Sequence, residues 1–314
     1  MDKISHRFLQ INGLNLHVAE IGSDSSPAVI FLHGFPEIWY TWRHQMIALA
    51  TAGFRSIALD YRGYGLSDPP AEPEKASYDD FVNDIASILD SLSISKVFVI
   101  AKDFGVWVAY SFILLHQEKI AGIVTLGMAF TPPAAYKPRF ALPEGFYVRR
   151  WQEPGRAEAD FGRFDVKTVV RNIYILFSRS EIPIANENQE IMDLVEPMTP
   201  LPSWFTEQDL ATYAALYEKS GFQTALQIPY RASKINLGSV EQVPIVKAPT
   251  MVIIGEEDYA TKIPGVDEYV RSGEVKKYVP NLETVYVPNG SHFVHEQFPN
   301  HVSQLILGFL NRNK

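Results

Sequence analysis

The residues that decide the fold read Val97-Phe98-Val99-Ile100-Ala101-Lys102-Asp103-Phe104-Gly105. The apolar run at the start is typical of a strand that is covered on both faces of a sheet. An acidic residue, Asp103, stands where this run ends, and helical spacing begins directly after it, over residues 104–116. Ala101 and Gly105, both small, lie two positions before and after Asp103. The stretch therefore predicts a strand, a tight turn that carries a carboxylate, and a helix.

Similar short apolar runs occur in both halves of the chain. They are Ala28–Leu32, Ile57–Leu59, Val97–Ala101, Ile123–Leu126, Met251–Ile254 and Val285–Val287. Two alternating stretches, Phe8–Ile11 and Leu14–Val18, flank Asn12-Gly13 and predict a hairpin. Residues 77–92 place their apolar side chains on one helical face. Because strands alternate with helices, we expect an α/β fold with a mostly parallel sheet.

The alternation breaks between residues 131 and 239. This part is rich in proline and aromatic residues, and its apolar spacing is helical where it is regular. Thr206-Glu207-Gln208-Asp209 matches a capping box and predicts a helix that runs to about Ser220. We therefore expect residues 1–130 and 240–314 to form the α/β core, and residues 131–239 to form an inserted helical lid, or cap.

Composition limits the function further. The 314 residues carry 28 Lys and Arg against 36 Asp and Glu, a net charge of −8, which argues against a nucleic-acid partner. The sequence contains no cysteine, so disulfides and thiolate chemistry are excluded. No run reaches the roughly 18 apolar residues of a membrane span. With a polar N-terminus as well, we expect a cytoplasmic protein, and the sequence leaves open whether it forms a homodimer.

Three other polar segments follow predicted strands. They are His33-Gly34-Phe35-Pro36-Glu37, Gly255-Glu256-Glu257-Asp258 and Gly290-Ser291-His292-Phe293. The carboxyl ends of parallel strands meet at one edge of a sheet, so these segments and Asp103 are expected to converge there.

The turn around Asp103 resembles the nucleophile elbow of α/β-hydrolases, and the order nucleophile, acid, histidine is that of the same superfamily. The resemblance implies that Asp103 is the nucleophile, Asp258 the triad acid and His292 the base. It also implies an oxyanion hole made by the backbone N–H groups of Phe35 and Phe104. Most members carry serine at the elbow, but Gly-x-Ser-x-Gly is absent here. An aspartate nucleophile can attack an sp³ carbon and leave an enzyme ester, which activated water then hydrolyses.

Two lid segments, Phe146-Tyr147-Val148-Arg149-Arg150-Trp151-Gln152-Glu153-Pro154-Gly155 and Pro229-Tyr230-Arg231, resemble the lid signature of plant-type soluble epoxide hydrolases. The resemblance covers nearly the whole chain. It implies that Tyr147 and Tyr230 donate hydrogen bonds to the oxygen of a small apolar epoxide, which is opened to a vicinal diol. It further suggests His33, Pro36 and Trp39 as substrate-binding residues. No dissociable cofactor is expected, because nucleophile, base and acid all come from the chain.

The elbow departs from the usual pattern of that family. Gly-His-Asp-Trp-Gly is replaced by Ala101-Lys102-Asp103-Phe104-Gly105, which puts a cation beside the nucleophile. Phe146 stands where plant relatives often carry a tyrosine. These changes leave the substrate open, and also whether simple hydrolysis is the reaction.

Several alternatives compete with this assignment. A dehalogenase shares the Asp nucleophile, but Phe104 lacks the N–H with which tryptophan holds a halide at that position. An epoxide-cyclising enzyme and a non-catalytic ligand receptor on the same scaffold are further alternatives.

Single residues also have alternative roles. Asp103 could cap the following helix, Glu256 or Glu257 could replace Asp258 as the triad acid, and His33 could be structural. Glu37 could position water or the loop, or it could have a surface role, and His295 has a surface or packing role. His292 and His295 lack a third ligand with suitable spacing, so a zinc site is rejected.

Overall fold

The computed structural model describes residues 3–132, 142–232 and 245–314. An eight-stranded sheet with the order β1-β2-β4-β3-β5-β6-β7-β8 forms its centre. The strands are β1 (Ser5–Ile11), β2 (Leu14–Ile21), β3 (Ala28–Leu32), β4 (Arg55–Leu59), β5 (Val97–Lys102), β6 (Ile120–Leu126), β7 (Thr250–Gly255) and β8 (Leu282–Val287). β2 runs antiparallel to β1 and β4, and every other pair of neighbours is parallel.

Every predicted strand and the predicted hairpin are confirmed, with some differences at the ends. β4 begins at Arg55, two residues before the predicted start, because polar residues can be buried there: the Arg55 guanidinium hydrogen-bonds Glu20 on the neighbouring β2. β3, β4 and β5 are buried at every residue. This burial explains why their sequences are almost continuously apolar instead of alternating.

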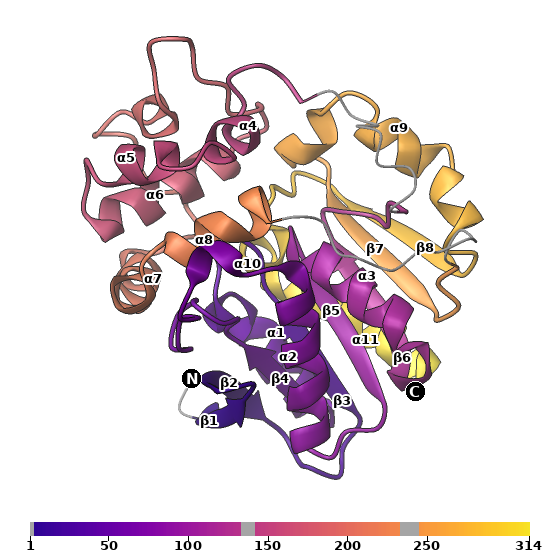
Figure 1. Cartoon of the computed structure of the whole chain (residues 1–314). Helices are drawn as coiled ribbons and strands as arrows, with labels where there is room; N and C mark the ends of the chain where they lie inside the picture. Colours follow the sequence, from indigo (N-terminus) through magenta and orange to yellow (C-terminus); the bar gives the residue numbers. More distant parts are fainter. Residues whose placement is uncertain (1–2, 133–141, 233–244) are drawn as a thin grey trace.

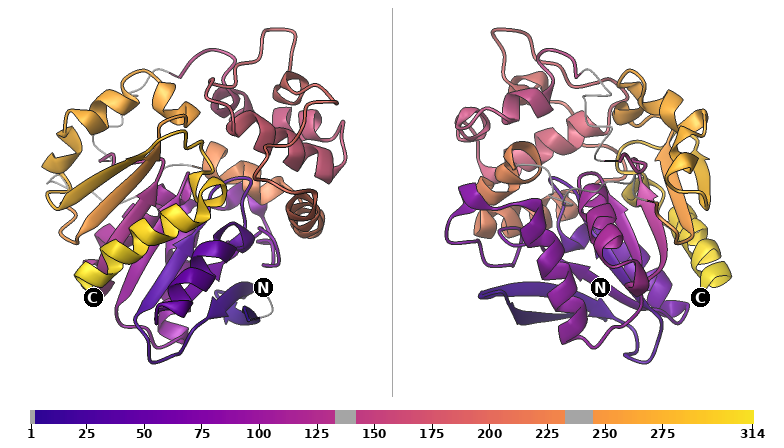
Figure 2. Two further views of the ribbon diagram at one scale, coloured as in Figure 1. Left: turned by 180° about the vertical axis from the view of Figure 1, so that it is seen from behind. Right: turned by 45° about the vertical axis from the view of Figure 1, so that its right-hand side comes forward.

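Helices cover both faces of the sheet. Those in its flanking layers are α1 (Arg43–Thr51), α2 (Tyr78–Ser91), α3 (Gly105–Leu115), α9 (Val266–Arg271), α10 (Val294–Gln297) and α11 (Pro299–Asn313). α2 packs against α3 on one face, and α1 packs against α11 on the other (Figures 1 and 2). The predicted helix start at Ser77 is confirmed, since Ser77 caps α2 through a capping box with Asp80. The fold is thus the predicted α/β-hydrolase fold.

Between β6 and β7, the described residues form helices and contribute no strand to the sheet. They are α4 (Tyr147–Trp151), α5 (Arg156–Phe161), α6 (Val166–Phe177), α7 (Glu207–Ser220) and α8 (Gln223–Leu226). These helices gather at one end of the sheet (Figure 1). The predicted capping box of α7 is confirmed: the Asp209 N–H donates to Thr206 Oγ1 at 3.1 Å, and the Thr206 N–H donates to Asp209 Oδ2 at 3.1 Å.

Hydrogen bonds join this helical segment to the core. The Tyr64 hydroxyl donates to the Ile228 carbonyl at 2.7 Å, and the Tyr40 hydroxyl donates to Asp209 at 3.0 Å. We propose to treat residues 131–239 as the lid, although the boundary between residues 239 and 240 lies outside the described residues. Among residues 3–132, 142–232 and 245–314, no helix combines the length and apolar character needed to cross a membrane.

Candidate active site

Asp103 lies at a sharp corner between β5 and α3. Its backbone φ of +50° is in the left-handed region, which is costly for a residue other than glycine and is common at functional sites. Small neighbours make the corner sterically feasible: a Cβ on Gly105 would collide with the His33 carbonyl, and one on Gly34 would collide with Asp103 itself. The Asp103 side chain keeps 15% of its surface exposed, so a reactant can reach it.

The alternative that Asp103 caps the following helix is wrong. α3 has no side-chain cap, and its N-cap residue is Phe104. The Asp103 carboxylate instead accepts a hydrogen bond from the backbone N–H of Phe35 at 3.1 Å, across from the loop after β3. A backbone hydrogen bond from Phe104 also helps to lower the pKa of Asp103. Both backbone donors proposed for the oxyanion hole therefore lie at the carboxylate.

His292 lies between the two predicted aspartates. Its Nδ1 is 3.0 Å from Asp258 Oδ1 and 3.2 Å from Oδ2, and its Nε2 is 3.5 Å from Asp103 Oδ2. Asp258 and His292 are buried, whereas Glu256 and Glu257 are exposed, so the alternative triad acids do not reach the imidazole. Gly127, which the sequence analysis did not single out, makes room for this pair: a Cβ there would lie 2.9 Å from Asp258 Oδ2.

Asp103 and His292 shift each other's pKa. Burial alone would raise the pKa of Asp103, but the hydrogen bond and charge of His292, together with the charge of Lys102, lower it to about 2. Burial and Lys102 oppose the charged form of His292, yet Asp258 and Asp103 raise the pKa of the imidazole to about 9. At neutral pH the site thus holds an ionised Asp103 facing an imidazolium.

The two predicted lid tyrosines face each other near this centre. Tyr147 begins α4, and Tyr230 lies in a short π-helix (Gln227–Arg231), with ring centroids 6.0 Å apart. Burial, followed by the charge of Asp103, raises the pKa of Tyr147; burial, Tyr147 and then Asp103 raise the pKa of Tyr230. Both phenols are therefore protonated at neutral pH and close enough to Asp103 to feel its charge.

Tyr259 is a site residue that the sequence analysis missed. It directly follows Asp258, and its hydroxyl oxygen is 2.9 Å from that of Tyr147. Its ring centroid lies 5.1 Å from the His292 ring. No motif marks it among the 15 tyrosines of the chain, and only its position beside Asp258 could have drawn attention to it.

The three predicted substrate-binding residues have different surroundings. His33 is buried, its Nδ1 lies 2.8 Å from the Gly34 carbonyl, and its ring packs on Tyr61, which agrees with the structural role considered for it. Pro36 is buried next to Phe35. The Trp39 ring packs against His6 and Tyr40, beside the β1–β2 hairpin. Contact of these residues with substrate stays a prediction.

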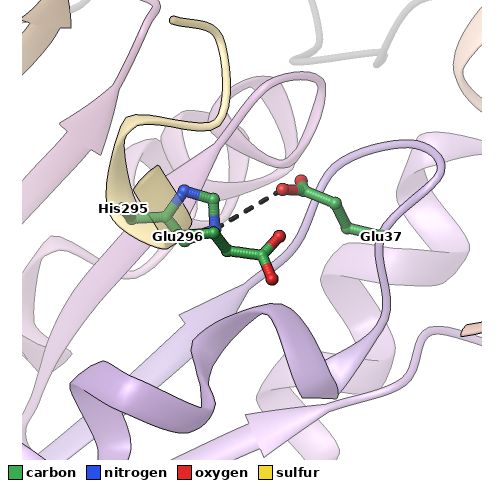
Figure 3. Close-up of side chains that lie close together, drawn as sticks. All are labelled: Glu37, His295 and Glu296. Carbon is green, nitrogen blue, oxygen red and sulfur yellow. Dashed lines mark ion pairs between the residues drawn. The ribbon is translucent and has the colours of Figure 1, made fainter. Parts of the chain in front are cut away.

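A buried polar network lies behind the elbow. Glu37 is fully buried, so the surface role considered for it is wrong. Its carboxylate accepts from the Gly34 N–H at 3.0 Å and lies 3.2 Å from Lys102 Nζ and 3.5 Å from His295 Nε2 (Figure 3). Lys102 Nζ also lies 4.6 Å from the centroid of the Phe293 ring. The unusual lysine of the elbow is thus an internal cation paired with Glu37.

The same network contains the group of described residues that could hold a metal ion. Ligand atoms of Glu37, His295 and Glu296 lie within 4.8 Å of one another (Figure 3). His295 is buried, so a surface role for it is wrong. Both carboxylates already have a cationic partner, Lys102 for Glu37 and Arg43 for Glu296, which a metal ion would have to displace. His292 is not part of this group, because it faces Asp258 and Asp103.

The sequence and the fold are similar to those of known proteins. Residues 27–299 match the model of the alpha/beta hydrolase fold family. The chain is 39% identical to epoxide hydrolase 1 of Siraitia grosvenorii, over 99% of this chain and all of the relative. The crystal structure of an epoxide hydrolase from Vigna radiata has a TM-score of 0.89 at 35% identity, covering 99% of each chain. Potato (Solanum tuberosum) epoxide hydrolase I has a TM-score of 0.86 at 34% identity, covering 99% of this chain and all of the other.

The chain therefore belongs to the α/β-hydrolase family. Within that family it groups over its full length with the plant epoxide hydrolases, as the resemblance of its elbow and lid motifs predicts.

Proposed function

We propose that the protein is an epoxide hydrolase that opens an apolar epoxide to a vicinal diol through an ester on Asp103. The observation that carries the proposal is one accessible carboxylate beside an imidazole, with two buried phenols close enough for its charge to raise their pKa values. The full-length similarity to plant epoxide hydrolases supports the same reaction.

Ring opening needs a nucleophile on carbon and a proton for the departing oxygen. A depressed pKa keeps Asp103 ionised, and one of its oxygens attacks an epoxide carbon. The C–O bond of the ring breaks, and its electron pair goes to the oxygen, which takes a proton from a lid phenol. Tyr147 and Tyr230 are the two candidate phenols, with rings that pack edge to face and pKa values that the charge of Asp103 helps to raise. General acid assistance of this kind contributes typically 10²–10⁴-fold to a rate.

Hydrolysis of the ester then needs a neutral imidazole. Esterification removes the carboxylate of Asp103, whose hydrogen bond with His292 is one of the causes of the raised pKa of the imidazole. The imidazolium then releases its proton, which balances the proton that the tyrosine gave up. His292 Nε2 takes a proton from water, and the water oxygen attacks the carbonyl carbon of Asp103. The N–H groups of Phe35 and Phe104 stabilise the oxyanion. Collapse breaks the ester C–O bond, the departing diol oxygen takes the proton from His292, and the carboxylic acid left on Asp103 returns its proton to His292, which restores the carboxylate and the imidazolium.

The surroundings favour an epoxide over a halide. Phe104 offers no side-chain N–H to a halide, whereas the paired phenols suit an oxygen leaving group. The phenols stand among aromatic rings, with Trp151 5.1 Å from Tyr230 and Phe177 4.8 Å from Tyr147 between centroids. These rings favour an apolar substrate.

A single-turnover reaction in ¹⁸O-labelled water tests the proposal. With trans-stilbene oxide or styrene oxide as probe, ¹⁸O should appear in the Asp103 carboxylate after one turnover, detected by mass spectrometry of the peptide. Asp103→Asn should form no ester, and His292→Gln should accumulate it. Glu256→Gln, which removes an exposed carboxylate two residues from Asp258, is the matched control and should turn over normally. Label that enters only the diol, or ligand binding without product, would refute the proposal.

A further inference from the structure

Tyr259 connects the proposed acid and base of the reaction. It begins a short 3₁₀-helix (Tyr259–Lys262) directly after Asp258 and is buried. Its hydroxyl oxygen is 2.9 Å from the Tyr147 hydroxyl oxygen, and its ring packs against the rings of His292 and Phe177. Tyr259, which directly follows the triad acid Asp258 in the chain, thus places a third phenol beside the lid residue Tyr147.

We propose that Tyr259 is a positioning residue for ring opening: it donates a hydrogen bond to the Tyr147 oxygen and makes Tyr147, not Tyr230, the main proton donor to the epoxide oxygen. This inference rests on the proposed function and deepens it. It assigns unequal roles to the two lid tyrosines.

The direction of the hydrogen bond follows from what each partner can do. An ether oxygen only accepts hydrogen bonds, so a Tyr147 proton that points at the epoxide is not available to Tyr259. The Tyr147 oxygen can then only accept. Among the described residues Tyr147 is the sole hydrogen-bond partner of the Tyr259 hydroxyl. Substrate binding should therefore fix Tyr259 as the donor and Tyr147 as the acceptor.

The hydrogen bond matters most after proton transfer. As the Asp103 oxygen bonds to carbon, the ring C–O bond breaks and its electron pair takes the Tyr147 proton. Negative charge is left on the Tyr147 oxygen, and a hydrogen bond to an ionised oxygen is roughly twice as strong as one between neutral groups. Burial and the charge of Asp103 raise the pKa of Tyr147, while the bond to Tyr259 lowers it. Burial is the main cause that raises the pKa of Tyr259, and the bond to Tyr147 raises it further.

Among the described residues, Tyr230 has no hydrogen-bond donor of the kind that Tyr259 provides to the Tyr147 oxygen. In the part of the chain that the structure describes, its hydroxyl makes no hydrogen bond, and its ring packs against Trp151 and Phe35 at centroid distances of 5.1 and 5.8 Å. A charge left on its oxygen would lack a stabilising donor from the protein. Tyr230 is thus suited to orient the epoxide, and Tyr147 to protonate it.

A double-mutant cycle tests this division of roles. The rate of ester formation is measured in single turnovers by intrinsic fluorescence, with trans-stilbene oxide as probe, for wild type, Y259F, Y147F, Y230F and the combinations of Y259F with each lid variant. Y259F keeps the buried ring and should slow ester formation about tenfold, since that is the factor for the ~1.4 kcal/mol expected of a hydrogen bond to a charged oxygen. The effect should persist in Y230F and vanish in Y147F.

The other outcomes separate the possibilities. A tenfold loss from Y259F in the Y147F background would show that Tyr259 acts through packing and would overturn the inference, as would an unchanged ester-formation rate or a loss confined to ester hydrolysis. If wild type forms no ester on Asp103, the proposed function fails and the inference fails with it. Y40F, which removes a buried hydroxyl bonded to Asp209 on α7, is the matched control and should leave ester formation unchanged.

Discussion

His292 Nε2 and Asp103 Oδ2 face each other at 3.5 Å, and each side chain shifts the pKa of the other toward its charged form. The proposed nucleophile is therefore also part of what keeps the proposed base protonated. Converting Asp103 to an ester removes its charge, so the imidazole becomes available as a base at the point in the reaction where one is needed.

Removal of the Asp103 charge should lower the pKa of His292. Asp103→Asn keeps the size of the side chain but deletes a carboxylate that helps to raise the pKa of His292 to about 9. Burial and the cation of Lys102 both lower the pKa of His292. In the variant they are opposed by one carboxylate, Asp258, instead of two. A histidine NMR titration measures this pKa directly. An unchanged pKa in the variant would contradict the coupling, and Glu256→Gln should leave it unchanged.

The imidazolium should also make stability depend on pH. The pKa of His292 is higher in the folded chain, about 9, than its ordinary 6.5, so the folded state binds the proton more tightly. The stabilisation is fully present below pH 6.5 and is lost as pH rises through about 9, and its full size is on the order of 3 kcal/mol. Urea unfolding of wild type and His292→Gln at pH 6, 8 and 10 gives the free energy of unfolding across the pH range in which this stabilisation is lost. The stability difference between the two proteins should shrink as pH rises, and a constant difference would rule the linkage out.

Lys102 should affect both the stability of the folded state and the pKa of the base His292. Its ammonium is 3.2 Å from the fully buried Glu37 carboxylate, so Lys102→Met leaves a buried charge without its partner, at a cost of roughly 3–5 kcal/mol. The double variant Lys102→Met with Glu37→Gln removes both charges and should recover most of that loss. Since the Lys102 cation lowers the pKa of His292, ester hydrolysis in the double variant should require a higher pH than in wild type. Full recovery of stability with an unchanged pH profile would assign Lys102 a purely structural role.

The two lid phenols should act on the first half of the reaction only. Tyr147→Phe and Tyr230→Phe keep the buried rings, which lie among Trp151, Phe177 and Phe35, and remove the protons offered to the epoxide oxygen. We expect the double variant to lose about 10³-fold or more in ester formation, since general acid assistance contributes typically 10²–10⁴-fold. Hydrolysis of an ester formed in advance should proceed at the wild-type rate. Equal losses in both steps would place the tyrosines outside proton donation.

Much of the fold and the centre of the site follow from local sequence. The buried strands are continuous apolar runs, and the capping boxes at Ser77 and Thr206 depend on residues three apart, so a single stretch contains the whole signal. Asp103, Asp258 and His292 can be placed together because parallel strands end at one edge of the sheet.

The polar network and Tyr259 could not be predicted in the same way. Glu296 meets Arg43 from 253 positions along the chain, and Tyr259 meets Tyr147 from 112 positions away. Nothing in the local sequence of Glu37 distinguishes a surface glutamate from one that is buried beside a lysine. Such pairs are determined by how segments far apart in the sequence pack together, so only the assembled fold reveals them.

The narrow space around the elbow gives the last prediction. A Cβ on Gly34 would collide with the Cβ of Asp103 and lie 2.8 Å from both Asp103 Oδ1 and Glu37 Oε2. Gly34→Ala should therefore displace the nucleophile from the Phe35 N–H, and a displacement of about 1 Å can cost on the order of 10² in rate. Ester formation should fall by that factor, while Gly308→Ala on α11 serves as the control, because its Cβ would meet only Arg312 Nη1 at 3.5 Å, an ordinary van der Waals contact. Single-turnover kinetics with styrene oxide provide the measurement. If Gly34→Ala forms the ester at the wild-type rate, then the attack of the carboxylate does not depend on the geometry of this corner.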